Sequence, residues 1–194
     1  MFFGRPKIKI ETQRLILRLP EQKDYSEWYR VRKEGQDFLL KWEPHRARDY
    51  SGRKSFRHRV YWSARSVSEG RALPLFLTDK KNGQFMGALT LDNIRRGPAQ
   101  MANLGYWIGP EFARQGFMRE AVVGLVAYAF ETLDLSRVEA ACLPKNAASR
   151  GLLEKSGFKY EGVAQSYLQI GGRWRTHVLY ANLRGDRRGR SGAE

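Results

Sequence analysis

Apolar and polar positions alternate over the first stretch of the chain, as they do in a strand that buries one face. The alternation predicts a strand from Lys7 to Arg18, which Pro20 ends. Asp24 is followed three residues later by Glu27, which is the spacing of a capping box. We therefore expect a helix that starts at this pair and runs to Gly35.

The period becomes helical between 51 and 69, where apolar residues recur every three or four positions and arginines take the other side. This pattern predicts a second helix, closed by Gly70, after a loop that carries Lys41-Trp42-Glu43-Pro44. A strand period follows over Leu73 to Thr78 and again over Gln84 to Ile94. Turn residues separate these two strands, so they form a predicted hairpin.

The second half of the chain shows the same changes of period. It predicts four further strands and two helices, with a two-residue glycine turn joining the last two strands. The strands are expected at 101–108, 137–143, 163–170 and 173–183, and the helices at about 116–132 and 146–157. This order of elements predicts a mixed α/β (α+β) fold, in which helices cover the faces of a mixed sheet.

The chain has 194 residues, of which 42% are hydrophobic, and this suffices for one sizeable core. We expect a single domain over 1–194, with a basic tail from about 184. The start, Met1 to Pro6, lacks the long apolar segment of a signal peptide, and the longest apolar run is too short for a membrane span. We expect a soluble cytoplasmic protein without membrane contact. The only cysteine, Cys142, excludes an internal disulfide and a multi-cysteine metal site, and is expected in the core.

The formal net charge of +15 and the isoelectric point near 10.2 predict attraction to polyanions, such as nucleic acid, a ribosome surface or a phosphorylated cofactor. Basic residues concentrate between Arg46 and Arg71, where aromatic residues are interleaved, and again in the tail from Arg184 to Arg190. The first region is either an RNA-binding face or a solvated helix face, and the charge alone does not distinguish them.

A candidate anion site lies between Leu104 and Ala121. An apolar, aromatic strand passes through a Gly-Pro break into a loop of small and basic residues that opens a helix. The N-terminus of a helix exposes unpaired N–H groups and carries a partial positive charge, to which Arg114 and Arg119 add full charges. The stretch therefore predicts a phosphate site, although ordinary strand-to-helix connections share these features.

The run Gly109-Pro110-Glu111-Phe112-Ala113-Arg114-Gln115-Gly116-Phe117-Met118-Arg119-Glu120-Ala121, followed by Asn146-x-x-Ser149 and Gly157-Phe158, resembles the acetyl-CoA-binding core of the GNAT superfamily of N-acetyltransferases. The resemblance covers most of the chain. The segments 41–44, 104–106 and 167–179 are similar to RimJ-type ribosomal-protein-alanine N-acetyltransferases. The resemblance implies the GNAT fold, which has a central, twisted, mostly antiparallel mixed sheet with helices on both faces.

The resemblance also implies the cofactor and its site. Acetyl-CoA would lie where a bulged strand at Tyr106-Trp107-Ile108 splays from the strand at 138–143, with a backbone N–H near Ile108 bonding the thioester oxygen. The expected cofactor-binding residues are Trp107, Ile108, Arg114, Gln115, Gly116, Phe117, Met118, Arg119, Asn146 and Ser149, and no metal is expected. The loop departs from the superfamily pattern because Ala113 and Met118 replace its first and last residues, which shifts the expected binding onto backbone amides.

Ser149 is the candidate general acid for the departing sulfur, and Tyr106 would order a water or line the acceptor slot. Helix capping is the alternative role for Asn146 and Ser149. The candidate bases are Glu43, Asp92 and Glu120, of which Glu43 is preferred because Trp42 and Pro44 would desolvate it.

The preferred acceptor is a protein N-terminus, most consistent with a ribosomal protein, with ribosomal RNA contacting the basic region. A terminal α-amine has a pKa of about 7.7–8.0, against about 10.4 for lysine, so it is already partly neutral near pH 7 and a single carboxylate acting through water could deprotonate it. The alternatives are acetylation of a small amine, such as a polyamine or an aminoglycoside, and a degenerate GNAT-like module that binds RNA or DNA. The acceptor's identity and the oligomeric state cannot be read from the sequence.

Overall fold

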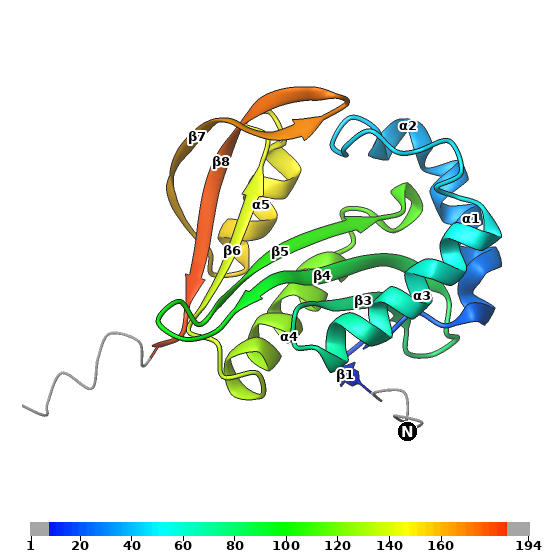
Figure 1. The fold of residues 1–194 in the computed structure, drawn as a ribbon, viewed down its shortest axis with the longest axis horizontal. Coiled ribbons are helices and arrows are strands. Elements are labelled where there is room, and N and C mark those ends of the chain that lie inside the picture. The colour runs from blue at the N-terminus through cyan, green and yellow to red at the C-terminus, as the bar shows by residue number, and fades with distance from the viewer. Residues whose placement is uncertain (1–7, 186–194) are drawn as a thin grey trace, which may run out of the picture.

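One eight-stranded sheet organises the chain, as the computed structural model of residues 8–185 shows (Figure 1). The opening residues and the basic tail from 186 onward lie outside this range. The strands are ordered β1-β2-β3-β4-β5-β6-β8-β7, and all neighbours are antiparallel except β5 and β6. The strands are β1 (Lys9–Glu11), β2 (Leu15–Arg18), β3 (Leu73–Asp79), β4 (Phe85–Arg95), β5 (Met101–Ile108), β6 (Arg137–Cys142), β7 (Lys159–Ile170) and β8 (Arg173–Leu183).

Helices cover both faces of this sheet, as predicted (Figure 1). The first three lie on one face, and α4 and α5 on the other; the helices are α1 (Tyr25–Glu34), α2 (Gln36–Leu39), α3 (Arg53–Ser68), α4 (Phe117–Glu131) and α5 (Ala147–Lys155). Short 3-10 turns occupy Gln22–Asp24 and Pro110–Phe112. Among the described residues, none of the helices combines the length and apolar character needed to cross a membrane.

The single strand predicted at the start of the chain is wrong. The chain turns back between Thr12 and Leu15, where Thr12 N–H donates to Leu15 O at 3.0 Å, so β1 and β2 form an antiparallel hairpin. The alternation of apolar and polar residues resembles that of one strand because both arms of the hairpin bury the same face, with Ile10, Leu15 and Leu17 all in the core. A period of two does not reveal a tight turn when polar residues occupy it.

The predicted capping box is also misplaced. Asp24 caps no N–H of α1; its carboxylate accepts from the Glu21 N–H at 2.7 Å and from both terminal nitrogens of Arg18. Glu27 pairs instead with Arg30 on its own helix. The reciprocal box is therefore formed by Glu21 and Asp24 around the short 3-10 turn. The expected end of the helix at Gly35 is confirmed.

The predicted central elements agree with the structure. The second helix is α3, followed by Gly70 at a φ of +65°, and the β3–β4 hairpin and β5 lie where expected. Phe56 of α3 packs against Phe76 of β3 and, with Trp28 of α1, forms the core on that face. These contacts fix α1 and α3 over the middle of the sheet, and the loop between α2 and α3 lies beside them.

The last two strands form a long hairpin that projects beyond the sheet (Figure 1). Gly171 and Gly172 supply its two-residue turn, with φ values of +57° and +77° that other residues rarely adopt. The Gly171 N–H donates to the Glu43 carbonyl at 3.1 Å. The tip of the hairpin is therefore attached to the loop that follows α2, far away in the sequence.

Candidate functional site

The two parallel strands at the centre of the sheet separate along their length (Figure 1). They pair from Met101 with Arg137 up to Leu104 with Ala140. Beyond that point β5 continues along β4 to Ile108, whereas β6 continues along β8 to Cys142. A V-shaped opening results in the middle of the sheet, at the position expected for the cofactor.

Backbone groups of β5 point into this opening. The Gly109 N–H donates to the Met86 carbonyl of β4 at 2.9 Å. In an antiparallel pair, every second residue directs its backbone N–H and C=O groups toward the neighbouring strand. The N–H groups of Tyr106 and Ile108 are therefore directed away from β4, toward the space that β6 has left. This is the orientation required to donate to a ligand in the opening.

The expected bulge at Tyr106-Trp107-Ile108 is not present. Pairing of β5 with β4 stays in register from Asn103 to Ile108, and the register shifts instead between Asp92 and Arg95 of β4. The two strands approach closely at Gly87, where a Cβ would lie 2.4 Å from the Trp107 carbonyl oxygen. The opening thus arises because β6 diverges, without an extra residue in β5.

Tyr106 and Ser149 meet on the α5 side of the opening. The phenol oxygen of Tyr106 lies 2.7 Å from Ser149 Oγ, and either atom can be the donor. Burial raises the pKa of the Tyr106 phenol, and the hydrogen bond to Ser149 offsets only part of this. Burial likewise raises the pKa of the neighbouring Cys142 thiol, again partly offset by Ser149. Two protonated hydroxyl groups, those of Tyr106 and Ser149, therefore lie together on the α5 side of the opening. Cys142 is buried in the core, as expected.

Asn146 caps α5. Its Oδ1 accepts the Ser149 N–H at 3.1 Å, which is the ordinary geometry of an N-cap residue. The capping role predicted as the alternative is thus present. The cap also holds the first turn of α5, from which the Ser149 hydroxyl reaches Tyr106. A role for Asn146 in binding cofactor remains a prediction.

The loop before α4 has the backbone of a ligand cradle. Arg114 and Gly116 both adopt the left-handed conformation, with φ values of +61° and +82°, and such backbone often occurs at ligand sites. Gly116 is the N-cap of α4 and provides no side chain to cap its N–H groups. The first N–H groups of this 15-residue helix are consequently available to an anion.

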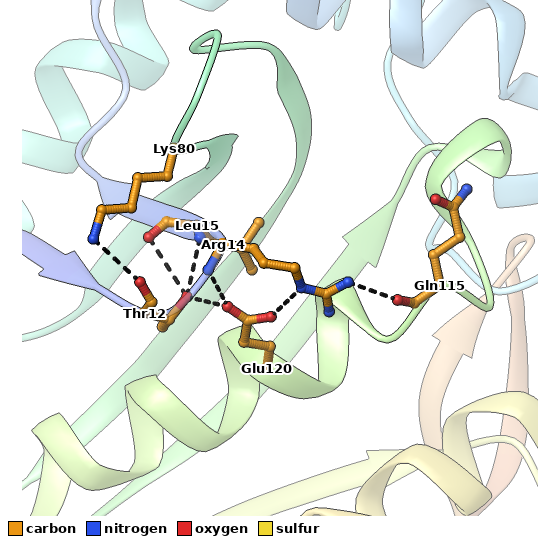
Figure 2. A network of polar contacts seen from close by, with 6 residues as sticks. All are labelled: Thr12, Arg14, Leu15, Lys80, Gln115 and Glu120. Atoms are coloured by element: carbon orange, nitrogen blue, oxygen red, sulfur yellow. Dashed lines mark hydrogen bonds and ion pairs between the residues drawn. The ribbon is translucent and has the colours of Figure 1, made fainter.

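Side chains brace this loop from outside. Arg14 donates from its Nη1 to the Gln115 carbonyl at 3.2 Å and from its Nε to Glu120 at 2.6 Å (Figure 2). A Cβ on Gly116 would lie 3.3 Å from Arg14 Nη2, and the guanidinium also covers the Phe117 ring at 4.3 Å. The first hairpin therefore sets the position of the loop.

Glu120 is a structural carboxylate. It accepts hydrogen bonds from the Thr12 hydroxyl at 2.6 Å, the Arg14 N–H at 2.7 Å and the Arg14 side chain (Figure 2). Burial raises its pKa, but these hydrogen bonds outweigh burial and lower the pKa below its ordinary value. Glu120 does not line the cleft described below, so its candidacy as a base is not supported.

The other loop residues divide between core, bracing and exposed positions. Met118 is buried in the core, so its bulk does not obstruct the loop backbone. Gln115 donates to the Glu111 carbonyl at 2.7 Å, and Arg119 donates to the Lys155 carbonyl at 3.1 Å, which ties α4 to the end of α5. Arg114 is exposed.

A cleft of about 620 Å³ opens on the α1–α3 side of the sheet. Tyr106, Trp107 and Ala141 line it where β5 and β6 diverge, so the cleft meets the opening between the strands. Asp92 lies at its rim on β4 and is exposed; its Oδ1 accepts the N–H of the adjacent Asn93. A ligand in the cleft and one held by the loop and α5 would approach the same point from opposite faces.

Glu43 lines this cleft, but it is engaged by Arg32. Both carboxylate oxygens accept from the guanidinium, each at 2.6 Å, and the Glu43 residue is only 8% exposed. Burial lowers the pKa of Arg32, but Glu43 outweighs burial and the pKa is raised overall. The geometry weighs against Glu43 as a free base, because desolvation by Trp42 and Pro44 is accompanied by this ion pair.

Three guanidinium groups surround the Tyr50 ring beside Glu43. The Arg32, Arg46 and Arg59 side chains lie 5.4, 4.5 and 4.9 Å from its centroid. Burial lowers the pKa of Arg59, Tyr50 offsets part of this, and the charge of Arg46 adds to it. We call these four residues, Arg32, Arg46, Arg59 and Tyr50, the arginine cluster.

The sequence predicted the basic region from Arg46 to Arg71 as a surface face, but it predicted neither the partly buried cluster with Arg32 nor the role of Arg14. The sequence does contain a sign of the cluster. Arg32 lies on the same helix face as the buried Trp28 and Val31, and Arg59 lies on the same helix face as the buried Phe56. An arginine on the buried stripe of an amphipathic helix is an unusual position that could have been noticed. Arg14 has no such signal, since its contact with the loop before α4 depends on the tertiary fold.

The sequence matches the model of a known family, described as Acetyltransferase (GNAT) domain, over residues 14–159. The chain belongs to the GNAT acetyltransferase family. Among curated proteins, this acetyltransferase is 32% identical to the [Ribosomal protein uS5]-alanine N-acetyltransferase of Escherichia coli (strain K12), over 91% of each chain.

Solved structures agree with this assignment. This GNAT acetyltransferase is similar to Mycobacterium smegmatis RimJ in complex with CoA-disulfide, with a TM-score of 0.87 and 28% identity over 94% of this chain and 90% of that one. It is also similar to the ribosomal-protein-S5-alanine acetyltransferase from Vibrio fischeri, with a TM-score of 0.85 and 27% identity over 92% and 98% of the chains. The predicted GNAT fold is confirmed.

Proposed function

We propose that this GNAT acetyltransferase transfers an acetyl group from acetyl-CoA to the N-terminal α-amine of a protein, and that the acceptor is a ribosomal protein. The observation that carries the proposal is the Tyr106–Ser149 hydrogen bond at the point where the cleft reaches the opening between β5 and β6. The named relatives support the choice of acceptor, because the Escherichia coli enzyme carries a ribosomal protein in its name.

The residues present fit acetyl-CoA. The left-handed loop and the start of α4, from Arg114 to Arg119, would hold the pyrophosphate mainly through backbone N–H groups. The Ile108 N–H is directed into the opening and would donate to the thioester oxygen. Trp107 lines the acceptor side of the same strand. When bound, acetyl-CoA supplies the activated acyl group and a thiol leaving group.

Ser149 would give its hydroxyl proton to the departing sulfur and take one from Tyr106 through their hydrogen bond, and the proton that the amine releases on acylation would restore the Tyr106 phenol. Both groups are protonated near neutral pH, since burial raises the pKa of the phenol and a serine hydroxyl does not ionise. An α-amine with a pKa of about 7.7–8.0 is already partly neutral there. Water relayed to the exposed Asp92 carboxylate at the rim of the cleft would complete the removal of its proton.

The arginine cluster argues against cationic small molecules. Polyamines and aminoglycosides carry several positive charges and would be repelled from the part of the cleft that Arg46 and Arg59 line. The outward side of α3 has a different character: Arg53, Arg57 and Arg65 are exposed beside Tyr61, which is 67% exposed. We assign this outer face to ribosomal RNA contact, which also implies a cytoplasmic enzyme.

The test of the proposed function is incubation with isotopically labelled acetyl-CoA and a panel of N-terminal peptides, followed by mass spectrometry to locate the label. We expect label on the α-amine, with peptides that start with alanine among the substrates. Labelling of spermidine or an aminoglycoside in preference to every peptide would favour a small-molecule enzyme. Acetyl-CoA binding without transfer to any acceptor would favour a binding module.

The RNA contact needs its own measurement. Affinity for assembling ribosomal particles should fall steeply as the salt concentration rises, because each phosphate contact releases counterions. Replacement of Arg53 and Arg57 by glutamine should reduce the slope of this dependence. Binding that is independent of salt would contradict the RNA contact and leave the acetyl transfer untouched.

A further inference from the structure

The arginine cluster contains an unusual number of unsatisfied donors. Among the described residues, only two buried side-chain nitrogen or oxygen atoms lack a hydrogen-bond partner, and they are Nε of Arg46 and Nε of Arg59. Buried polar groups in folded proteins are almost always hydrogen-bonded. Two such atoms in the same cluster indicate that a group absent from the isolated chain accepts from them.

The charge of the cluster points to an anion. Glu43 is the carboxylate beside the cluster, and both of its oxygens accept from Arg32, whereas Arg46 Nε lies 3.7 Å from Glu43 Oε2, beyond hydrogen-bonding distance. Three positive charges therefore face one negative charge in a partly buried site. Tyr50 stabilises the guanidinium groups through its ring and hydrogen-bonds the Arg59 side chain, but the Nε atoms of Arg46 and Arg59 still have no hydrogen-bond partner.

The location of the cluster identifies which ligand can reach it. Arg46 and Arg59 line the same cleft as Tyr106, and the Arg32 guanidinium lies 4.7 Å from the ring of Trp107, the next residue of β5. A molecule bound by the cluster can therefore extend along the cleft to the reaction centre. In the proposed function that molecule is the acceptor polypeptide.

We propose that the arginine cluster binds the carboxylate of an aspartate or glutamate within the first five residues of the acceptor protein, and so selects acidic N-terminal segments. This inference rests on the proposed function. A planar carboxylate matches the fork of an arginine side chain and can accept from both Arg46 and Arg59. Occupation of the cluster would fix the direction in which the acceptor enters, with its α-amine toward Tyr106.

A peptide carboxylate suits this site better than an RNA phosphate. The unsatisfied Nε atoms are buried, so the ligand must enter the cleft, whereas a nucleic-acid backbone requires cations on an open surface. Such cations are present on the outer side of α3, away from the cluster. The two anions are thus expected on different parts of the same helix.

The test uses pairs of alanine-first peptides that differ only by Glu or Gln at position 2, 3, 4 or 5. Both turnover with labelled acetyl-CoA and direct binding to the enzyme saturated with CoA are measured. We expect at least one position at which Glu raises kcat/KM and affinity about tenfold over Gln, mainly through KM. In Arg59→Met the ratio should fall to near one, and Arg59→Lys should restore part of it.

Two controls keep the result specific. Lys33→Met removes the same charge from an exposed position on α1 and should keep the full Glu preference. Arg46→Met provides a second cluster variant in case Arg59→Met does not fold, which thermal unfolding and CoA binding would reveal. A preference that falls equally in Lys33→Met would reflect net charge alone and would overturn the proposed site.

The outcomes separate the two proposals. Equal turnover of Glu and Gln peptides overturns the carboxylate site and leaves the proposed function standing. Glu-selective binding without turnover supports the site and contradicts N-terminal acetylation. Loss of affinity for a short RNA in Arg59→Met, with an unchanged Glu/Gln ratio, overturns the carboxylate site in favour of a phosphate ligand.

Discussion

The phenol oxygen of Tyr106 and the Oγ atom of Ser149 lie 2.7 Å apart, joining the separated end of β5 to the first turn of α5. Because β6 no longer pairs with β5 at this point, this hydrogen bond is a link across the opening. It also brings together two hydroxyl groups that burial keeps protonated or that do not ionise, which suits the transfer of a proton to a leaving group.

Replacement of Ser149 by Ala should lower kcat roughly a hundredfold, since a positioned general acid contributes on that scale. Affinity for acetyl-CoA, measured by calorimetry, should change little, because backbone groups provide most of the proposed binding. If the two hydroxyls act as one unit, the Tyr106→Phe and Ser149→Ala double variant should be no slower than Ser149→Ala. Unchanged turnover in Ser149→Ala would remove this residue from the mechanism.

Gly116→Val should weaken acetyl-CoA binding about tenfold, more than Arg119→Ala does. A side chain at 116 must adopt a φ of +82°, and its Cβ would approach Arg14 Nη2 to 3.3 Å, so the loop has to shift. Arg119 is already engaged with the Lys155 carbonyl, and its loss should matter less. Gly83→Val is the matched control, with a φ of +74° and open space around it; the reverse ranking of the first two variants would contradict the backbone cradle.

Glu43→Gln should reduce the free energy of unfolding by about 3 kcal/mol in urea titrations, because it leaves the buried Arg32 without its charged partner. The residual activity should keep the pH profile of the wild type. Glu69→Gln, which removes the exposed partner of Arg65, should leave the free energy of unfolding almost unchanged. A stable Glu43→Gln variant that has lost the acidic limb of its pH profile would instead identify Glu43 as the base.

Glu120→Gln should destabilise the protein by about 1–2 kcal/mol near neutral pH, and by less in acid. The pKa of Glu120 is lowered in the folded state, so the stabilisation is complete above its ordinary pKa of 4.5 and is lost as the pH falls through the lower folded value. Denaturant unfolding of both proteins between pH 3 and pH 7 checks this. A difference in stability that stayed constant on acidification would contradict the role of the Thr12 and Arg14 hydrogen bonds.

Local pattern was enough to predict most elements of the fold. β5 and the glycine turn between β7 and β8 appear where the sequence placed them, because strand period and turn residues are local signals. The Thr12–Leu15 turn escaped notice, since its two short strands bury the same face and contain no glycine or proline. The Glu21–Asp24 box was misassigned because several acidic residues near Asp24 have compatible spacings.

The backbone features of the site could be predicted from the sequence, whereas the contacts between its charged side chains could not. The loop at Gly116 follows from a motif whose order in the chain is informative, and Tyr106 and Ser149 were both predicted at the site, although their hydrogen bond was not. The engagement of Glu43 by Arg32 is a tertiary contact between residues 11 positions apart, and no local spacing specifies it. The positions of the carboxylates could therefore be listed from the sequence, but not their partners.

Glu43 joins two distant parts of the molecule through different atoms. Its side chain holds α1, and its carbonyl accepts from Gly171 at the tip of the β7–β8 hairpin. Any displacement of the hairpin tip, which flanks the cleft through Tyr167 and Leu168, is therefore transmitted to the residue that neutralises Arg32. Under the proposed function, one amino acid would therefore couple the width of the acceptor entrance to the charge on its wall.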